Sequence, residues 1–180
     1  MSNKVFLGLG SNLNKSNALR FALAKLKEFL DDVTISSVYQ NKAVRQAEPD
    51  YYNMVIRANT SLTLDELYNK LLEIENEAGS EMMFFEGTNF GVKPRIDIDV
   101  LTYGTLVETT PCKVPRHDIQ DYPFVLCPLT EIEPDFVHPL LDIKVKEIWD
   151  EMRPRLPEHM VVTKIDFDFN KPFTSWDEKE

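Results

Sequence analysis

Two aspartates separated by one residue are the sharpest chemical feature of the sequence. They lie in the run Ile96-Asp97-Ile98-Asp99-Val100, in which apolar and acidic residues alternate. On a strand, alternate side chains share a face, so the two aspartates project together, with Cα atoms roughly 7 Å apart. Two like charges so close raise each other's pKa unless a cation lies between them. Magnesium suits such a pair, because it prefers one or two carboxylates with phosphate oxygens and water, and it would neutralise charge in an in-line transfer. The alternative is a strand with one solvated face.

Three other stretches carry residue types that could line a ligand site. Residues 8–12 (GLGSN) follow a predicted strand, but they lack the Lys-Ser/Thr of a P-loop and the third glycine of a dinucleotide fingerprint. Tyr51 and Asn53 share one strand face, and an amide offers the donors and the acceptor that a flat heterocycle needs. Residues 116–118 (RHD) precede Phe124 and form either a polar cluster beside a ligand or a charged loop.

Composition narrows the class of protein. The chain has 180 residues, 43% of them hydrophobic, which suits a single globular domain over residues 1–180. Its net charge of −10 disfavours nucleic-acid binding. No run approaches the roughly 18 apolar residues of a membrane span, the first residues do not resemble a secretory signal, and Cys112 and Cys127 form no CxxC pair. A cytoplasmic protein with reduced thiols and without an obligatory protein partner is expected.

Hydrophobic periodicity and end signals predict the elements that must position these residues. The capping box Thr63-x-x-Glu66 opens a helix, and Gly79 is placed to end it. Residues 80–95 lack a clean period and are predicted to be a long loop. Strands are expected over 4–10, 33–44, 51–61 and 96–103, and helices over 16–30, 63–79, 124–132 and 143–152. This order is the ferredoxin-like βαββαβ pattern, an α+β fold with an antiparallel sheet and its two main helices on one face.

Taken together, the motifs resemble the 6-hydroxymethyl-7,8-dihydropterin pyrophosphokinase family of folate biosynthesis. They occur in that family's order and at close to its spacing. The resemblance implies a ferredoxin-like fold and transfer of the ATP pyrophosphoryl group to a pterin hydroxymethyl, which yields AMP. The matching stretches are residues 6–13 (FLGLGSNL), 36–39 (SSVY), 50–53 (DYYN), 74–75 (IE), 96–101 (IDIDVL), 114–115 (VP) and 124–132 (FVLCPLTEI).

The resemblance also implies roles for individual residues. Asp97 and Asp99 match the ligands of two magnesium ions, with ATP as co-substrate. The residues implied on the pterin side are Tyr51, Asn53, which reads the pterin edge, Phe124, which stacks on the ring, and Val44, which contributes backbone groups. Val100 matches a residue beside the adenine.

The chain departs from the family where phosphate-binding cations are usual. No cation follows Gly79, and Pro94 holds the position of the usual arginine before the first aspartate. Arg95 lies one residue closer and is expected to act in catalysis and ATP binding. Further ATP-side replacements are expected at Lys93, Arg116 and His117, and Phe90 is the nearest substitute on the pterin side for the family's tryptophan.

Three functions fit this pattern. The first is an active pyrophosphokinase with a rearranged cation set. The second is a weak or inactive relative that binds a pterin or a nucleotide, and the third is a related transferase with a different heterocycle.

Overall fold

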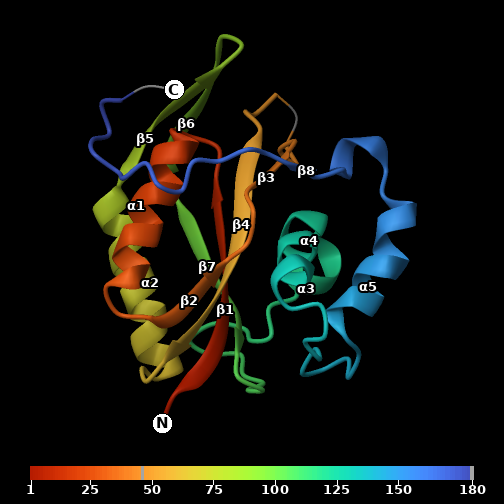
Figure 1. Ribbon diagram of the computed structural model, residues 1–180. Helices are drawn as coiled ribbons and strands as arrows, with labels where there is room; N and C mark the ends of the chain where they lie inside the picture. Colours follow the sequence, from red (N-terminus) through yellow and green to blue (C-terminus); the bar gives the residue numbers. More distant parts are fainter. Residues whose placement is uncertain (46, 179–180) are drawn as a thin grey trace.

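A computed structural model describes residues 1–45 and 47–178 (Figure 1). The strands are β1 (Asn3–Ser11), β2 (Asp31–Ile35), β3 (Tyr39–Asn41), β4 (Tyr51–Thr60), β5 (Ser80–Phe85), β6 (Thr88–Pro94), β7 (Asp97–Tyr103) and β8 (Thr163–Lys164). The helices are α1 (Lys15–Lys27), α2 (Leu64–Ala78), α3 (Asp118–Asp121), α4 (Pro123–Ile132) and α5 (Val145–Met152), with short 3-10 turns η1 (Arg153–Arg155) and η2 (Glu158–Met160).

The main sheet is antiparallel and has the strand order β7-β1-β4-β3-β8, with β2 also paired to β4. Figure 1 shows α1 and α2 on one side of this sheet and α3, α4 and α5 on the other. The predicted α+β, ferredoxin-like arrangement is confirmed, including the placement of the two main helices on one face.

The first layer forms because two amphipathic helices cover one face of the sheet. The α2 helix buries Leu67, Leu71 and Ile74, and the reciprocal bonds between Thr63 and Glu66 at its start confirm the capping box. These side chains pack with alternate residues of β1 and β7 into one apolar core. The strands are therefore fixed in register from this face, since a shift by one residue would turn their apolar side chains to the other face.

The second layer covers only part of the opposite face. Phe6 of β1, Val55 of β4 and Leu101 of β7 pack there against α4 and α5. Further along β1, the positions that face the same way are Gly8 and Gly10. Because a glycine fills no space above the sheet, this part of the face is left open beside α4.

Two predicted elements need correction. The strand expected over residues 33–44 is broken into β2 and β3, because the Ser36 hydroxyl accepts a hydrogen bond from the Val55 backbone N–H in place of a regular ladder. The long loop expected over residues 80–95 is a hairpin of β5 and β6. Its alternation is interrupted by a register shift after Met83, and its turn residues Glu86 and Gly87 both have positive φ, as two-residue hairpin turns require.

The segment after η2 returns across the sheet edge to α1 (Figure 1). β8 pairs with β3, and the chain then lays its aromatic side chains over the first helical layer. The Phe21 ring of α1 lies 5.3 Å from that of Phe173 and 5.2 Å from that of Trp176. The tail thus completes a hydrophobic surface that α1 would otherwise expose. Within the described residues, the helices lack the combination of length and apolar character that crossing a membrane requires.

Candidate active site

A cavity of about 420 Å³ occupies the open part of the sheet. Its floor is β1, where Gly8 pairs with Asp99 of β7 on one side and with Val55 of β4 on the other. Gly10 pairs in the same way with Asp97 and Asn53. The two bare glycines therefore separate an acidic wall from an amide wall, and the predicted pairing of Asp97 with Asp99 on one face is confirmed.

The acidic wall is only partly neutralised by the protein. The Arg116 Nε lies 3.7 Å from Asp99 Oδ2 and 2.9 Å from Asp118 Oδ2. Desolvation by the cavity walls raises the pKa of Asp97 and of Asp99, and the charge of Arg116 opposes this effect. Both carboxylates thus retain a deficit of positive charge, which a cation from solution would fill.

The amide wall holds Asn53 in one orientation. Its Nδ2 donates a 2.6 Å hydrogen bond to Asn41 Oδ1, and Asn41 Nδ2 in turn donates to the Lys42 carbonyl. Both asparagines are buried and line the cavity. The pair offers fixed donors and acceptors to the edge of a flat ligand. Tyr51, predicted on the same face, also lines the cavity.

An aromatic wall faces the sheet at the start of α4. The rings of Tyr122 and Phe124 stack with centroids 4.9 Å apart and an interplanar angle of 17°. Both residues line the cavity, as does Val44 from the loop after β3. Phe124 therefore lies at the cavity, and its stacking on a pterin ring stays a prediction from the family resemblance.

Cations reach the cavity from one loop and from the end of strand β6. Lys93 at the base of the hairpin and Arg45 in the loop after β3 both line it, as does Glu48 from that loop. The Glu48 Oε1 lies 3.6 Å from Arg45 Nη1 and 3.7 Å from Lys93 Nζ. Lys93 is thus at the cavity, as predicted, and Arg45 is a second cation beside it.

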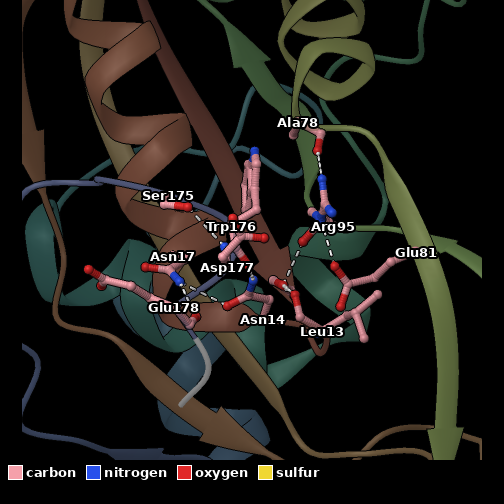
Figure 2. A network of polar contacts seen from close by, with 11 residues as sticks. Leu13, Asn14, Asn17, Ala78, Glu81, Arg95, Ser175, Trp176, Asp177 and Glu178 are labelled. Atoms are coloured by element: carbon pink, nitrogen blue, oxygen red, sulfur yellow. Dashed lines mark hydrogen bonds and ion pairs between the residues drawn. The ribbon is translucent and has the colours of Figure 1, made fainter.

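Arg95 is placed elsewhere, and its expected position at the ATP site needs correction. Figure 2 shows its guanidinium between the Ala78 carbonyl and the Glu81 carboxylate, with Trp176 alongside. The hydrogen bonds are 2.6 Å to the carbonyl and 2.8 Å to the carboxylate, and the guanidinium lies 4.5 Å from the indole centroid. The chain bends between β6 and β7, so the side chain leaves toward the end of α2 rather than along the face of Asp97. There it joins α2, the hairpin and the tail.

Four other predicted residues lie outside the cavity lining, and one of them, Arg116, approaches it through its contact with Asp99. Val100 points into the core beneath the first helical layer, as its alternation with Asp99 dictates, so its side chain does not face the cavity. Phe90 lies on the hairpin strand β6. His117 pairs through Nδ1 with the Asp121 carboxylate on the surface of α3. Their proposed ligand contacts stay predictions from the family resemblance.

Some cavity residues were not predicted as site residues. Arg45 and Glu48 line it, and Glu75 of α2 lies close enough to Asp97 and Asp99 to be affected by their charge. Asp118, from the polar stretch 116–118, also lines the cavity. The polar composition of residues 45–50 indicated a loop, but composition does not fix the direction in which a loop folds. Residues 74–75 matched the family, and that match was the available signal for Glu75.

The contact between Gly10 and Asn53 predicts a selective loss of pterin binding. A Cβ added at Gly10 would lie 2.5 Å from Asn53 Oδ1, whereas one at Gly8 would meet Leu101 Cδ2 at 3.4 Å. Gly10→Ala should displace the amide and raise the pterin Kd about tenfold, as expected when a buried polar contact is lost. Titration calorimetry with Gly8→Ala as the matched control tests this, and equal losses in the two variants would contradict it.

The raised pKa of Glu75 leads to a prediction of how the stability of the fold depends on pH. Burial, followed by the charges of Asp97 and Asp99, raises its pKa to about 7, although the Ile98 backbone N–H donates to it. The folded state therefore binds this proton more tightly than the unfolded state. That contribution is complete below the unfolded pKa and is lost as pH rises through about 7.

We expect Glu75→Gln to reduce the fall in melting temperature between pH 5 and pH 8 in EDTA. The change in the free energy of unfolding over this pH range should differ from that of wild type by on the order of 1 kcal/mol, since Glu75 is only half-buried. Glu73→Gln, two residues earlier and exposed, is the control. A Glu75→Gln profile that parallels wild type would refute the assignment.

The donor set fits magnesium better than a metal that needs a complete protein cage. Within residues 1–45 and 47–178, no group of three or more histidine, cysteine or acidic side chains is arranged to hold a metal. Two carboxylates on one strand face instead leave most coordination positions to phosphate oxygens and water, as Mg²⁺ prefers. Asp97 and Asp99 are the residues that could hold it.

Comparison with known proteins agrees with this geometry. The 7,8-dihydro-6-hydroxymethylpterin-pyrophosphokinase (HPPK) family profile matches residues 6–134. The 2-amino-4-hydroxy-6-hydroxymethyldihydropteridine pyrophosphokinase of Aquifex aeolicus is 38% identical over 82% of this chain and 91% of its own length. That of Haemophilus influenzae is 34% identical over 74% of this chain and 84% of its own length.

Solved structures share the fold. Plasmodium falciparum HPPK-DHPS superposes with a TM-score of 0.69 at 12% identity over 88% of this chain. This chain spans 44% of that longer protein. The extent of the family match and the identity to full-length relatives settle the assignment: the chain belongs to the 7,8-dihydro-6-hydroxymethylpterin-pyrophosphokinase family.

Proposed function

We propose that this cavity transfers the β,γ-pyrophosphoryl group of ATP to the hydroxymethyl oxygen of 6-hydroxymethyl-7,8-dihydropterin. The products are AMP and the pterin diphosphate, an intermediate of folate biosynthesis. The observation that carries the proposal is the shared cavity, in which Asp97 and Asp99 face Asn53 across two glycines. Family membership supports the activity.

The pterin is bound at the amide and aromatic walls. Asn53, held by Asn41, reads the edge of the heterocycle through its donors and acceptor, and Phe124 stacks on the ring. Tyr51 and Val44 border the same space. This placement directs the hydroxymethyl group of the pterin toward the acidic wall.

The acidic wall orients the phosphates. We propose two Mg²⁺ ions, held by Asp97 and Asp99, that neutralise the developing charge when bound. The pterin oxygen forms a bond to the β-phosphorus as the bond from that phosphorus to the bridging oxygen of AMP breaks. The hydroxyl proton passes to solvent. Arg116, 3.7 Å from Asp99, is positioned to limit repulsion at this wall.

The remaining features of the proposal concern the protein as a whole. Residues 1–180 act as one domain, which the contacts of the tail with α1 support. The unpaired thiols of Cys112 and Cys127 support a cytoplasmic location, since reduced cysteines suit that compartment. The expected partners are ATP and the pterin.

The test is a coupled assay for AMP together with titration calorimetry. We expect AMP to form only when ATP, magnesium and 6-hydroxymethyl-7,8-dihydropterin are all present. Binding of the pterin without AMP formation would favour the inactive relative. Turnover of another heterocycle at a higher kcat/KM would favour the related transferase.

A further inference from the structure

Glu48 forms ion pairs with Arg45 and Lys93 in the lining of the cavity, and their geometry bears on ATP binding. Glu48 has only 7% of its side chain exposed, yet its two cationic neighbours lie at 3.6 and 3.7 Å, beyond ordinary hydrogen-bond distance. Burying a carboxylate with such long contacts is costly, because loose ion pairs do not replace its lost hydration. The arrangement therefore stabilises Glu48 less than a set of direct hydrogen bonds would.

The two cations come from separate segments, and in the described part of the chain both pair with the Glu48 carboxylate. Arg45 belongs to the loop between β3 and β4, and Lys93 to the last residues of β6. Both line the cavity with Asp97 and Asp99. The cations thus lie at the same wall as the proposed metal ligands.

We propose that Arg45 and Lys93 bind the triphosphate of ATP and that Glu48 holds them in place until the nucleotide displaces it. The inference rests on the proposed function, because it assigns residues to the ATP side of that site. A phosphate chain carries more charge than one carboxylate and can accept hydrogen bonds from both cations. Arg45 and Lys93 would take the place of the cations that the chain lacks after Gly79 and at Pro94.

Glu48 is then a positioning residue that sets ATP affinity. Its negative charge competes with phosphate for the same two cations, so removing it should favour the nucleotide. Glu48→Gln keeps the size of the side chain and removes the charge. We expect the Kd of α,β-methylene-ATP, which cannot release AMP, to fall about fivefold in magnesium, while the Kd of the pterin is unchanged.

Three comparisons separate this effect from a general change in charge. Glu28→Gln removes the same charge at the far end of α1 and should leave nucleotide binding unchanged. Arg45→Ala and Lys93→Ala should each raise the analogue Kd about fivefold or more. In an Arg45→Ala, Lys93→Ala background, Glu48→Gln should give no gain, since the cations for which it competes are absent.

The outcomes distinguish this inference from the proposed function. Binding of the analogue by wild type, with no gain in Glu48→Gln, would overturn the role of Glu48 alone. A gain that persists in the double-alanine background would also overturn it, since the effect would not act through the two cations. Failure of wild type to bind the analogue in magnesium would overturn the proposed function itself.

Discussion

Replacing Asp97 and Asp99 together by asparagine will lower kcat by about a thousandfold or more, because charge stabilisation of the transferring group depends on the Mg²⁺ that we propose these carboxylates hold. The two residues lie on one strand face opposite Gly10 and Gly8, and within the described part of the chain the ion-pair partner of Asp99 is Arg116, at 3.7 Å. Asparagine keeps their size but binds Mg²⁺ weakly. Steady-state AMP formation measures the loss.

The same variant should fold normally. Desolvation raises the pKa of both aspartates, so their charged forms are disfavoured in the folded protein and the neutral amides should not lower the melting temperature at pH 8. Asp31→Asn, on the exposed start of β2, is the control for charge. A double variant that folds and retains wild-type kcat would rule out the metal assignment.

Ending the chain after Lys164 will lower the free energy of unfolding by several kcal/mol, about 3–5 from the aromatic contacts alone. The truncation removes Phe173 and Trp176, which lie 4.7 Å apart and cover Phe21. It also removes the indole beside Arg95 and the hydrogen bonds from Asn14 and Asn17 to the tail carbonyls. For a chain of this length the melting temperature should fall by about 10 °C or more.

Single variants locate this effect. Trp176→Ala should reproduce a large part of the loss, whereas Phe169→Ala, on an exposed ring, should cost much less. Differential scanning calorimetry at one protein concentration makes the comparison. If the truncated protein melts at the wild-type temperature, the tail is not part of the folded domain.

Arg95 connects the tail to the site. Its backbone carbonyl accepts a 2.6 Å hydrogen bond from the Ser11 hydroxyl at the end of β1, and its side chain holds the end of α2 and Glu81. It stands two residues before Asp97. We therefore interpret Arg95 as a residue that positions the start of β7, rather than one that contacts ATP.

Local pattern was sufficient to predict the parts of the site that lie on regular strands. The alternation around Asp97 and Asp99 fixed their shared face, and the Tyr51 and Asn53 face followed from the same rule. The helical faces were equally clear, since the apolar spacing of α2 and its capping box act within one segment. Register then followed from burial of one strand face.

The parts of the fold and the site that the sequence did not predict depend on contacts between segments far apart in the chain. The hairpin at residues 80–94 was missed because its alternation is interrupted at Met83, and pairing between its own strands stabilises it. The direction of Arg95 depends on a bend in the chain and on Trp176, 81 residues later in the sequence. Likewise, Glu48 meets Lys93 only after the loop and the hairpin have folded.

The most direct test of the central claim is ³¹P NMR of a reaction between the protein, MgATP and 6-hydroxymethyl-7,8-dihydropterin. Attack on the β-phosphorus at the wall of Asp97 and Asp99 predicts equal amounts of AMP and a pterin diphosphate, which has two coupled phosphorus resonances. Formation of ADP with a pterin monophosphate would show attack on the γ-phosphorus and would contradict the account. So would unchanged ATP resonances with the folded wild-type protein in the presence of both substrates and magnesium.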